Sequence, residues 1–347
     1  MQQIFRYVNS LMKRLRLLSS GKKSGQFTQK LQLVTYNIVP LNPNTGILEW
    51  VENTIPFGDY LLDRGKKPGE TAILGAHSRY FPGEWGYRLC RMKLAEADAT
   101  QKRQVYDTLC HNFSPAFRFF FVERFISNLQ EWHSAKTRYT RSCAVSSIVG
   151  HMLGIGDRHA QNILIHQKTG EVVHIDFGIV FEQGRELPTP ETVPFRLTRD
   201  IVDGMGPTET AGAFSRAAEE TTRVLRKNSK ALLTILSAIV ADPLYKWKES
   251  AEKARQRQQQ ELLDVKGKGC ATASQTSEHR VFAGDDITDE CDAGSRAISK
   301  IHEKLQGFEE GTSSERQSIE GQVQLLIKAA RDPENLCALF PGWSPWL

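Results

Sequence analysis

The sequence predicts an α+β fold in which a few short strands near the N-terminus precede many helices. Apolar residues recur at helical spacing over most of the chain, and a few short apolar runs have the length of strands. The 347 residues suffice for one large domain or two ordinary ones. Contents of 40% hydrophobic and 24% charged residues are those of a soluble globular protein.

The composition argues against several classes of protein. The net charge of +5 is too mild to predict a nucleic-acid partner, and no apolar run approaches the ~20 residues that span a membrane. The N-terminus lacks the pattern of a signal peptide. Six scattered cysteines without a C-x-x-C pair indicate reduced thiols. The composition therefore indicates an intracellular protein with no evident nucleic-acid or membrane partner.

The N-terminal region is predicted to contain one helix and two strands. Apolar residues from Ile4 to Leu18 recur at helical spacing from the start of the chain. Residues 31–41 and 46–51 read as strands, with a turn at 42–44 between them. A domain rarely begins inside a helix without a preceding cap, so we expect the natural domain to start further upstream.

The next part of the chain is predicted to be a loop followed by helices. Residues 63–86 are rich in Gly, Pro and charge, which is typical of a surface loop. Helical patterns follow at 95–110, 115–125 and 129–153, and the last should end at Gly154.

The remaining elements are a hairpin and further helices. Two short apolar runs, 162–166 and 171–175, predict the hairpin. Helices should resume at about 198 and continue to 260, and the composition of 265–295 predicts a flexible linker. Two short helices are expected after the linker, at 296–306 and 320–330.

Four polar residues around this hairpin form a set suited to phosphoryl transfer. Asp157, His159 and Asn162 precede the first strand, and Asp176 follows the second. Mg²⁺ prefers oxygen ligands, which Asn162 and Asp176 can supply. Asp157 suits the orientation of an attacking hydroxyl, and His159 can donate a hydrogen bond to the transferred phosphoryl group. Asp157 and His159 are therefore the candidate catalytic residues, and Asn162 and Asp176 the candidate metal ligands.

Two other interpretations of these residues remain open. Asp157, Arg158 and His159 could cap a helix and form a salt bridge. Histidines could instead bind zinc, although their spacing matches no common zinc site. The four histidines concerned are His151, His159, His166 and His174.

The order of the motifs resembles one kinase superfamily. Ordinary protein kinases carry H-R-D-x-x-x-x-N before D-F-G. Here the inverted motif D-R-H-x-x-N at 157–162 precedes D-F-G at 176–178, which resembles the phosphatidylinositol-3-kinase superfamily. Residues 188–206 resemble the activation loop and following helix of the ATM-type branch of the phosphatidylinositol-3-kinase-related protein kinases. Residues 340–347 resemble the FATC tail that ends chains of this family.

The resemblance implies a bilobal kinase fold with a truncated N-lobe and a mainly helical C-lobe. Residues 1–53 would be the remnant of the N-lobe, with helix C, strands and hinge. Residues 54–262 would form the C-lobe with the catalytic and activation loops. A flexible linker or regulatory segment would span 263–314, and the FATC tail 315–347.

The aromatic residues of the tail allow two interpretations. Phe340, Trp343 and Trp346 could dock a partner or membrane, or they could pack on the lower lobe beside the activation loop. The resemblance favours packing.

ATP and Mg²⁺, or Mn²⁺, are the cofactors that the resemblance implies. Glu49, Trp50 and Val51 resemble the hinge that holds adenine through backbone groups. Leu164 and Ile175 are assigned to the same ATP site, with Trp50 and Ile175 covering the ring. Trp50 could alternatively be an ordinary core aromatic.

The substrate is expected to be a protein hydroxyl rather than a lipid. A loop that holds a polyanionic headgroup should be basic, whereas the segment from Phe177 to Thr198 carries two arginines against three glutamates, a net charge of −1. The resemblance implies Ser or Thr followed by Gln in the substrate, a role in DNA-damage signalling and a nuclear location. It also implies as partners the rest of a full-length kinase, a homodimer partner and, indirectly, DNA-break sensor proteins.

Two parts of an ATP site are not found in the sequence. No G-x-G-x-x-G precedes the hinge, and no lysine lies on a strand before residues 2–18. We therefore expect Met1 to be an internal methionine of a longer protein, and the chain alone to be poorly soluble and nearly inactive. A non-catalytic binding module is the alternative function, and a lipid kinase is the less favoured one.

Overall fold

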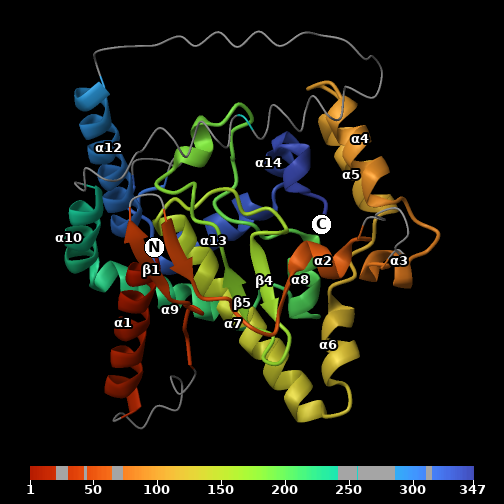
Figure 1. Ribbon diagram of the computed structural model, residues 1–347, viewed down its shortest axis with the longest axis horizontal. Coiled ribbons are helices and arrows are strands. Elements are labelled where there is room, and N and C mark those ends of the chain that lie inside the picture. The colour runs from red at the N-terminus through yellow and green to blue at the C-terminus, as the bar shows by residue number, and fades with distance from the viewer. Residues whose placement is uncertain (21–29, 43–44, 65–72, 241–255, 257–285, 310–314) are drawn as a thin grey trace.

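The computed structural model describes residues 1–20, 30–42, 45–64, 73–240, 256, 286–309 and 315–347. It is a mainly helical molecule with two small sheets (Figure 1). The first elements are α1 (Gln2–Ser20), β1 (Ile38–Asn42), β2 (Thr45–Leu48), β3 (Thr54–Pro56), α2 (Phe57–Leu61), α3 (Ala76–Tyr80), α4 (Tyr87–Glu96), α5 (Lys102–Asn112), α6 (Arg118–Phe125) and α7 (Leu129–Met152). The later ones are β4 (Ile163–His166), β5 (Val172–His174), α8 (Arg199–Met205), α9 (Ala213–Lys227), α10 (Ser229–Val240), α12 (Asp286–Gln306), α13 (Ile319–Arg331) and α14 (Pro333–Ala338). The predicted α+β class is confirmed.

Helix α7 is the central element of the fold. The side chain of Asn128 caps its N-terminus by accepting hydrogen bonds from the backbone N–H groups of Gln130 and Glu131, both at 3.1 Å. Residues 142–149 are all buried, and the helix packs against α6, α8 and α9 (Figure 1). Because α7 leads directly into the loop at 154–162, this buried helix fixes where that loop begins.

Strands β3, β4 and β5 form an antiparallel sheet in that order. The predicted hairpin is confirmed, with Leu164 of β4 opposite Val173 of β5. Strand β3 was not predicted, and its Pro56 pairs with Leu164 from the other side. Ile163, Leu164 and Ile165 are all buried, which explains why β4 reads as a continuous apolar run rather than an alternating one.

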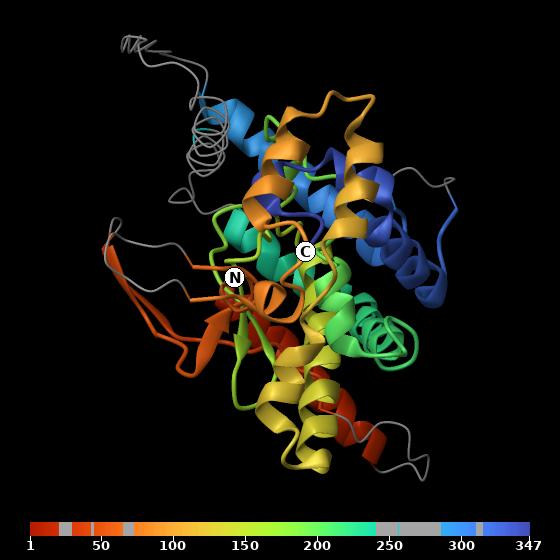
Figure 2. The same ribbon diagram turned by 90° about the vertical axis from the view of Figure 1, so that its right-hand side faces the viewer.

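Strands β1 and β2 form a separate hairpin that projects from the helical body (Figure 2). Val39 lies opposite Ile47, and every residue of both strands is exposed. Residues 43 and 44 of the predicted turn lie outside the described residues. A hairpin with both faces in water has no core of its own to stabilise it.

The strand predicted at 31–41 is wrong over residues 31–37, which are irregular. Helix α1 supplies hydrogen-bond partners for part of this backbone, where a sheet would have a neighbouring strand. Asn9 accepts a hydrogen bond from Leu33 N–H at 2.8 Å and donates one to Leu33 O at 2.9 Å. Leu33 packs with α1 in the main core, and Tyr36 packs with Leu164 and Val173 of the neighbouring sheet, contacts that local sequence patterns do not reveal.

Two predictions for 63–110 are wrong. The helix predicted at 95–110 is divided, because the chain turns at Asp98, whose carbonyl accepts hydrogen bonds from the N–H groups of Gln101 and Lys102 at 2.8 and 3.0 Å. The loop predicted at 63–86 contains α3, and residues 65–72 of it lie outside the described residues. Within α3, His77 is buried and stacks on Phe113 with ring centroids 3.5 Å apart.

The helical region predicted from 198 to 260 consists of α8, α9 and α10 as far as residue 240. Gly206 ends α8 with φ +83°, and Gly212 precedes α9 with φ +76°. This backbone conformation favours glycine, so the two residues break what the apolar pattern presents as one helix. Of residues 241–260, the structure describes only Gln256, which is helical.

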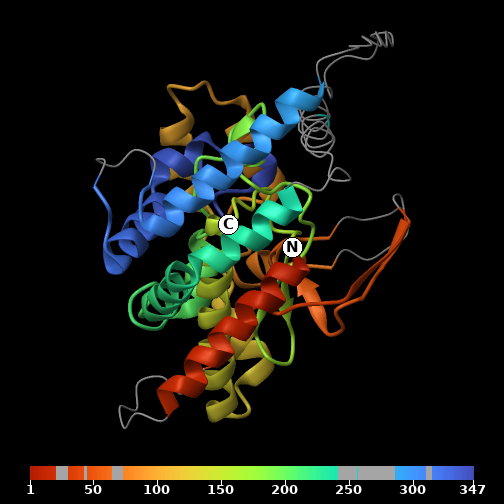
Figure 3. The same cartoon turned by 90° about the vertical axis from the view of Figure 1, so that its left-hand side faces the viewer.

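Helix α12 corrects the prediction of a flexible segment. It begins at Asp286, inside the predicted linker 265–295, and its end packs into the protein beside α9 and α10 (Figure 3). Ile301 and Leu305 are buried. Lys304 is buried too, and its ammonium donates to the carbonyl of His151 at 2.8 Å and pairs with Glu182. Most of the residues of 263–314 that the structure describes thus belong to a helix, and its C-terminal part packs against the rest of the protein.

Two expectations from composition can be compared with the structure. Within the described ranges, no helix is both long and apolar enough to cross a membrane. Cys90, Cys110, Cys143 and Cys337 are free thiols, as the scattered cysteines predict.

Candidate active site

The catalytic loop, residues 154–162, connects the buried end of α7 to β4. Gly154 has φ +58°, and a Cβ there would lie 2.4 Å from the backbone nitrogen of Glu182. Asp157 and Asp176 also have positive φ, at 56° and 54°. Non-glycine residues in this region cost free energy and persist only where surrounding contacts hold them. The two acidic residues are therefore held in specified backbone conformations.

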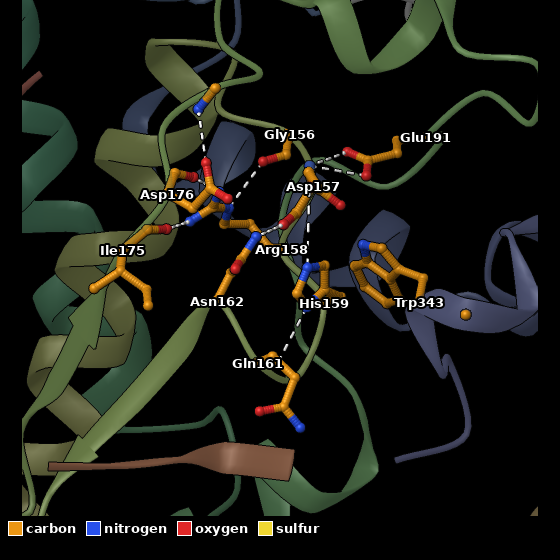
Figure 4. Close-up of polar contacts among 12 residues, drawn as sticks. Gly156, Asp157, Arg158, His159, Gln161, Asn162, Ile175, Asp176, Glu191 and Trp343 are labelled. Carbon is orange, nitrogen blue, oxygen red and sulfur yellow. Dashed lines mark hydrogen bonds and ion pairs between the residues drawn. The ribbon is translucent and has the colours of Figure 1, made fainter. Parts of the chain in front are cut away.

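Asp157 and His159 lie next to each other at the surface of the loop (Figure 4). His159 Nε2 is 4.0 Å from an oxygen of Asp157, and both side chains are about three-quarters buried. His159 Nδ1 accepts a hydrogen bond from Gln161 N–H at 3.1 Å. A neutral imidazole with Nδ1 as acceptor carries its proton on Nε2, which is the nitrogen that lies 4.0 Å from Asp157.

Asn162 and Asp176 present oxygen atoms on the opposite side of the loop (Figure 4). The amide nitrogen of Asn162 donates to the carbonyl of Asp157 at 2.9 Å, which turns the amide oxygen away from that contact. One carboxylate oxygen of Asp176 accepts from Gly178 N–H at 3.2 Å. An amide oxygen and a carboxylate are ligands that Mg²⁺ accepts, so the residues fit a magnesium ion that also binds phosphates.

Arg158, between the two candidate catalytic residues, ties the catalytic loop to the D-F-G turn. It is buried and donates to the carbonyls of Gly156 at 2.8 Å, Ile175 at 2.7 Å and Asp176. Its guanidinium also lies 5.4 Å from the ring centroid of Phe177. Burial lowers the pKa of Arg158 from its ordinary value. The interpretation of this triplet as a helix cap is wrong, because Arg158 joins two loops, whereas the salt bridge in the same interpretation has a counterpart in the 4.0 Å contact of Asp157 with His159.

Glu191 is a part of the site that the motifs did not reveal. Its two carboxylate oxygens accept hydrogen bonds from the backbone N–H of Asp157 at 2.9 and 3.0 Å (Figure 4). Burial, and next the charge of Asp157, raise the pKa of Glu191 to about 7. In the sequence, Glu191 was only one of the charges counted in the activation loop.

A small apolar cluster lies beside the loop. Val51, Leu164 and Ile175 belong to it, so the structure brings together three of the five residues predicted to bind the nucleotide. The cluster is completed by Val34, Tyr36, Val173 and Phe177. Residues from the chain after α1 thus line the same wall as β4 and β5, a contact that spacing in the sequence could not show.

The other two predicted hinge residues lie apart from this wall. Trp50 is 84% exposed, so its interpretation as a core aromatic is wrong. The carboxylate of Glu49 accepts hydrogen bonds from Asn37, from the backbone N–H at 2.7 Å and from the side-chain amide at 2.6 Å. Glu49 N–H in turn donates to Asn37 O at 2.9 Å.

The C-terminal tail packs against the activation loop, as predicted. Trp343 and Trp346 are buried, and Phe340 is half-buried. Arg196 lies 4.2 Å from the ring centroid of Trp343 and donates to the carbonyls of Trp343 at 2.6 Å and Ser344 at 2.8 Å. Burial lowers the pKa of Arg196 to about 9. The tail is therefore part of the core and not a free docking segment.

The histidines proposed as zinc ligands have separate surroundings. His151 contacts Glu309 at 3.1 Å, and His166 accepts a hydrogen bond from Thr169 N–H at 3.2 Å. Burial lowers the pKa of His174 to about 3. In the part of the chain that the structure describes, no three His, Cys, Asp or Glu side chains form a group that could hold a metal, so the zinc interpretation is wrong for these histidines.

Comparisons with known proteins identify the family of the chain. The model of the family described as phosphatidylinositol 3- and 4-kinase matches residues 1–249, and that of the FATC domain matches residues 316–347. The Arabidopsis thaliana "Serine/threonine-protein kinase ATM" is 44% identical over 347 residues, which are all of this chain and 8% of that protein. The Sus scrofa "Serine-protein kinase ATM" is 41% identical, with 100% of this chain and 11% of that protein covered.

A solved structure is similar over the whole chain. The structure described as "FAT and kinase domain of CtTel1" has a TM-score of 0.76 and 35% identity, and covers 100% of this chain and 20% of that one. The chain spans about a tenth of the length of the two curated relatives above. The chain belongs to the phosphatidylinositol 3- and 4-kinase family and carries a FATC domain at its C-terminal end.

Proposed function

We propose that the chain is the catalytic region of a serine/threonine protein kinase that transfers the γ-phosphate of ATP to a protein hydroxyl. The observation that carries this proposal is the grouping of Asp157, His159, Asn162 and Asp176 at the end of one hairpin, beside an apolar wall. The curated relatives reported above are named as serine or serine/threonine kinases, which supports a protein substrate.

Each residue has a role that its contacts support. Asp157 orients the attacking hydroxyl and accepts its proton, and the Nε2–H of His159 donates to the phosphoryl oxygens as their charge builds. Asn162 and Asp176 would hold Mg²⁺ or Mn²⁺, which neutralises phosphate charge when bound. Charge stabilisation of this kind is the main contribution of a protein to phosphoryl transfer.

The adenine would lie against the apolar wall and the hinge. Leu164, Ile175 and Val51 supply apolar surface, and backbone groups at Glu49 and Trp50 would form hydrogen bonds with the edge of the adenine ring. Trp50, being exposed, would have to move onto the ring to cover it. We assign residues 1–53 to the N-lobe, 54–262 to the C-lobe and 315–347 to the tail.

The charge count used against a lipid substrate needs correction. Glu191 binds the backbone of Asp157, Arg196 is buried under the tail, and Glu182 pairs with Lys304. Three of the five charges counted are therefore engaged inside the protein and do not describe the surface that a substrate meets. The preference for a protein over a lipid rests on the relatives instead.

The finer assignments follow from the relatives. We propose Ser or Thr followed by Gln in the substrate, a role in DNA-damage signalling and a nuclear location. Two related structures are described as "Complete CtTel1 dimer with C2 symmetry" and "Tel1 kinase butterfly symmetric dimer", which supports a homodimer partner within a longer kinase. DNA-break sensor proteins would act on it indirectly.

The first test is binding of a non-hydrolysable ATP analogue with Mg²⁺, measured by thermal shift. Wild type should gain stability, Asp176→Ala should lose most of the gain, and Asp98→Ala, an exposed acid outside the site, should keep it. Transfer is then measured to a Ser-Gln peptide, a Ser-Ala peptide and phosphoinositide vesicles. Binding without transfer to any acceptor would favour a non-catalytic module, and transfer to the vesicles would favour a lipid kinase.

A further inference from the structure

We propose that Glu191 is a positioning residue of the catalytic loop, whose carboxylate holds the backbone N–H of Asp157 and so fixes where the Asp157 side chain points. This inference rests on the proposed kinase function. In this role the activation loop need not contact a substrate. Its Glu191 accepts the hydrogen bond from the backbone of the catalytic loop.

The backbone of Asp157 needs such an acceptor. With φ +56° the residue lies in the left-handed region, outside any helix or strand ladder. Its N–H therefore takes no acceptor from a helix or a strand, and a buried N–H without an acceptor costs about 1–3 kcal/mol. Both oxygens of Glu191 lie within 3.0 Å of this nitrogen, so one side chain satisfies the donor and restricts its direction.

The packing around the carboxylate is an independent observation. A Cβ added at Gly156 or at Gly184 would lie 2.8 Å from the same oxygen of Glu191. Two glycines, one from each loop, thus leave the space that this oxygen occupies. Glu191 N–H also donates to Gly184 O at 3.0 Å, which holds the backbone that carries the side chain.

Two nearby arginines partly offset the repulsion between the carboxylates of Glu191 and Asp157. The hydrogen bond from Asp157 N–H, Arg158 and Arg196 all favour the ionised form of Glu191, but burial and the charge of Asp157 outweigh them and raise its pKa to about 7. Arg196 also donates to the carbonyl of Arg158 at 3.3 Å. The peptide segment at Asp157 and Arg158 is therefore held at its N–H by the carboxyl group of Glu191 and at its C=O by the guanidinium of Arg196, both from the activation loop.

Glu191 acts through Asp157 and not on the reacting atoms, since its carboxylate is directed at the backbone. Its loss should reduce turnover more than nucleotide binding, because the apolar wall and Asp176 keep their own contacts, although Asn162, which donates to the Asp157 carbonyl, should shift with the loop. A displacement of about 1 Å in a reacting group can cost about a hundredfold in rate.

The experiment compares Glu191→Ala and Glu191→Gln with wild type, and with Glu186→Ala as control for an exposed glutamate of the same loop. The readouts are kcat and the KM for ATP with a Ser-Gln peptide, and hydrogen exchange of a peptide covering 154–160. We expect kcat to fall about a hundredfold in Glu191→Ala with KM changed less than about threefold. Gln retains one acceptor oxygen, so the kcat of Glu191→Gln should fall between those of Glu191→Ala and wild type, and exchange in 154–160 should quicken most in Glu191→Ala and less in Glu191→Gln.

Two results would overturn the inference. One is a kcat of Glu191→Ala within twofold of wild type, and the other is unchanged exchange in 154–160. If wild type gains no stability from the ATP analogue with Mg²⁺, the proposed function fails, whereas the exchange measurement still decides the role of Glu191. Glu191→Gln, which keeps the volume of the side chain, separates loss of positioning from unfolding of the Ala variant.

Discussion

Arg196 of the activation loop and Trp343 of the C-terminal tail form one buried contact. The guanidinium lies over the indole at 4.2 Å and donates to the Trp343 carbonyl at 2.6 Å. Since Arg196 also donates to the carbonyl of Arg158, the last residues of the chain are joined to the catalytic loop through one side chain. The tail is thereby a structural part of the candidate active site.

Replacing Trp343 should destabilise the whole protein. Trp343→Ala removes a buried ring and leaves a cavity beside a buried cation, so we expect the free energy of unfolding to fall by about 3–5 kcal/mol. Trp50→Ala is the matched control, because Trp50 is 84% exposed and its loss should cost less than about 0.5 kcal/mol. Urea denaturation followed by fluorescence measures both. Equal effects at the two positions would contradict the buried role of the tail.

Replacing Asp157 should abolish transfer and leave nucleotide binding intact. Asn has nearly the same volume and tolerates positive φ, so Asp157→Asn should fold, but it cannot accept a proton from the hydroxyl. We expect phosphate transfer to fall by at least about a hundredfold, with an unchanged thermal shift by Mg·ATP analogue. Asp98→Asn serves as the control in the same assays. A fully active Asp157→Asn protein would remove Asp157 from the catalytic residues.

The buried pair of Lys304 and Glu182 should contribute to the free energy of unfolding by linking α12 to the segment that follows the D-F-G turn. Burial opposes ionisation of Glu182, but Lys304, with Arg185 and His151, outweighs it, so the pKa of that carboxyl is lowered. Lys304→Met removes the buried cation while Arg185, 2.6 Å away, still pairs with Glu182, so we expect a loss below the about 3–5 kcal/mol that a buried charge without a partner costs. A double-mutant cycle with Glu182→Gln should show coupling of at least about 1 kcal/mol. Additive effects would mean that the two charges do not stabilise each other.

Asp200 should make stability depend on pH. It accepts hydrogen bonds from the N–H groups of Ala116 at 2.7 Å and Phe117 at 3.1 Å, and burial raises its pKa to about 7. The folded state then binds the proton more tightly than the unfolded state, whose value is near 3.8. The stability from this proton is present below the unfolded pKa and is lost as the pH rises to about 7.

The measurement for Asp200 is the free energy of unfolding of wild type and of Asp200→Asn between pH 4 and 8. The difference, wild type minus variant, should decrease with rising pH by up to about 1.4 kcal/mol per unit within that window. Glu191 titrates in the same range but is common to both proteins, so it cancels in the difference. Parallel pH curves would show that the pKa of Asp200 is not raised.

The sequence predicted the proposed chemistry and most of the helices. The motif residues Asp157, His159, Asn162 and Asp176 carry functional groups that only a few reactions need together, so their identities and order indicate phosphoryl transfer before any coordinates are known. Long elements such as α7 and α13 were predictable because an amphipathic or continuously apolar pattern over many residues depends on local spacing.

Tertiary structure alone decided which distant groups meet. The acceptor for Asp157 N–H comes from Glu191, the partner of Trp343 is Arg196, and Leu33 is held by Asn9 instead of by a strand. These contacts join residues far apart in the chain, and their free energy depends on burial and direction, which residue type and spacing do not encode. The sequence therefore determined what this site can do, and the packing of its loops decided how the groups are held.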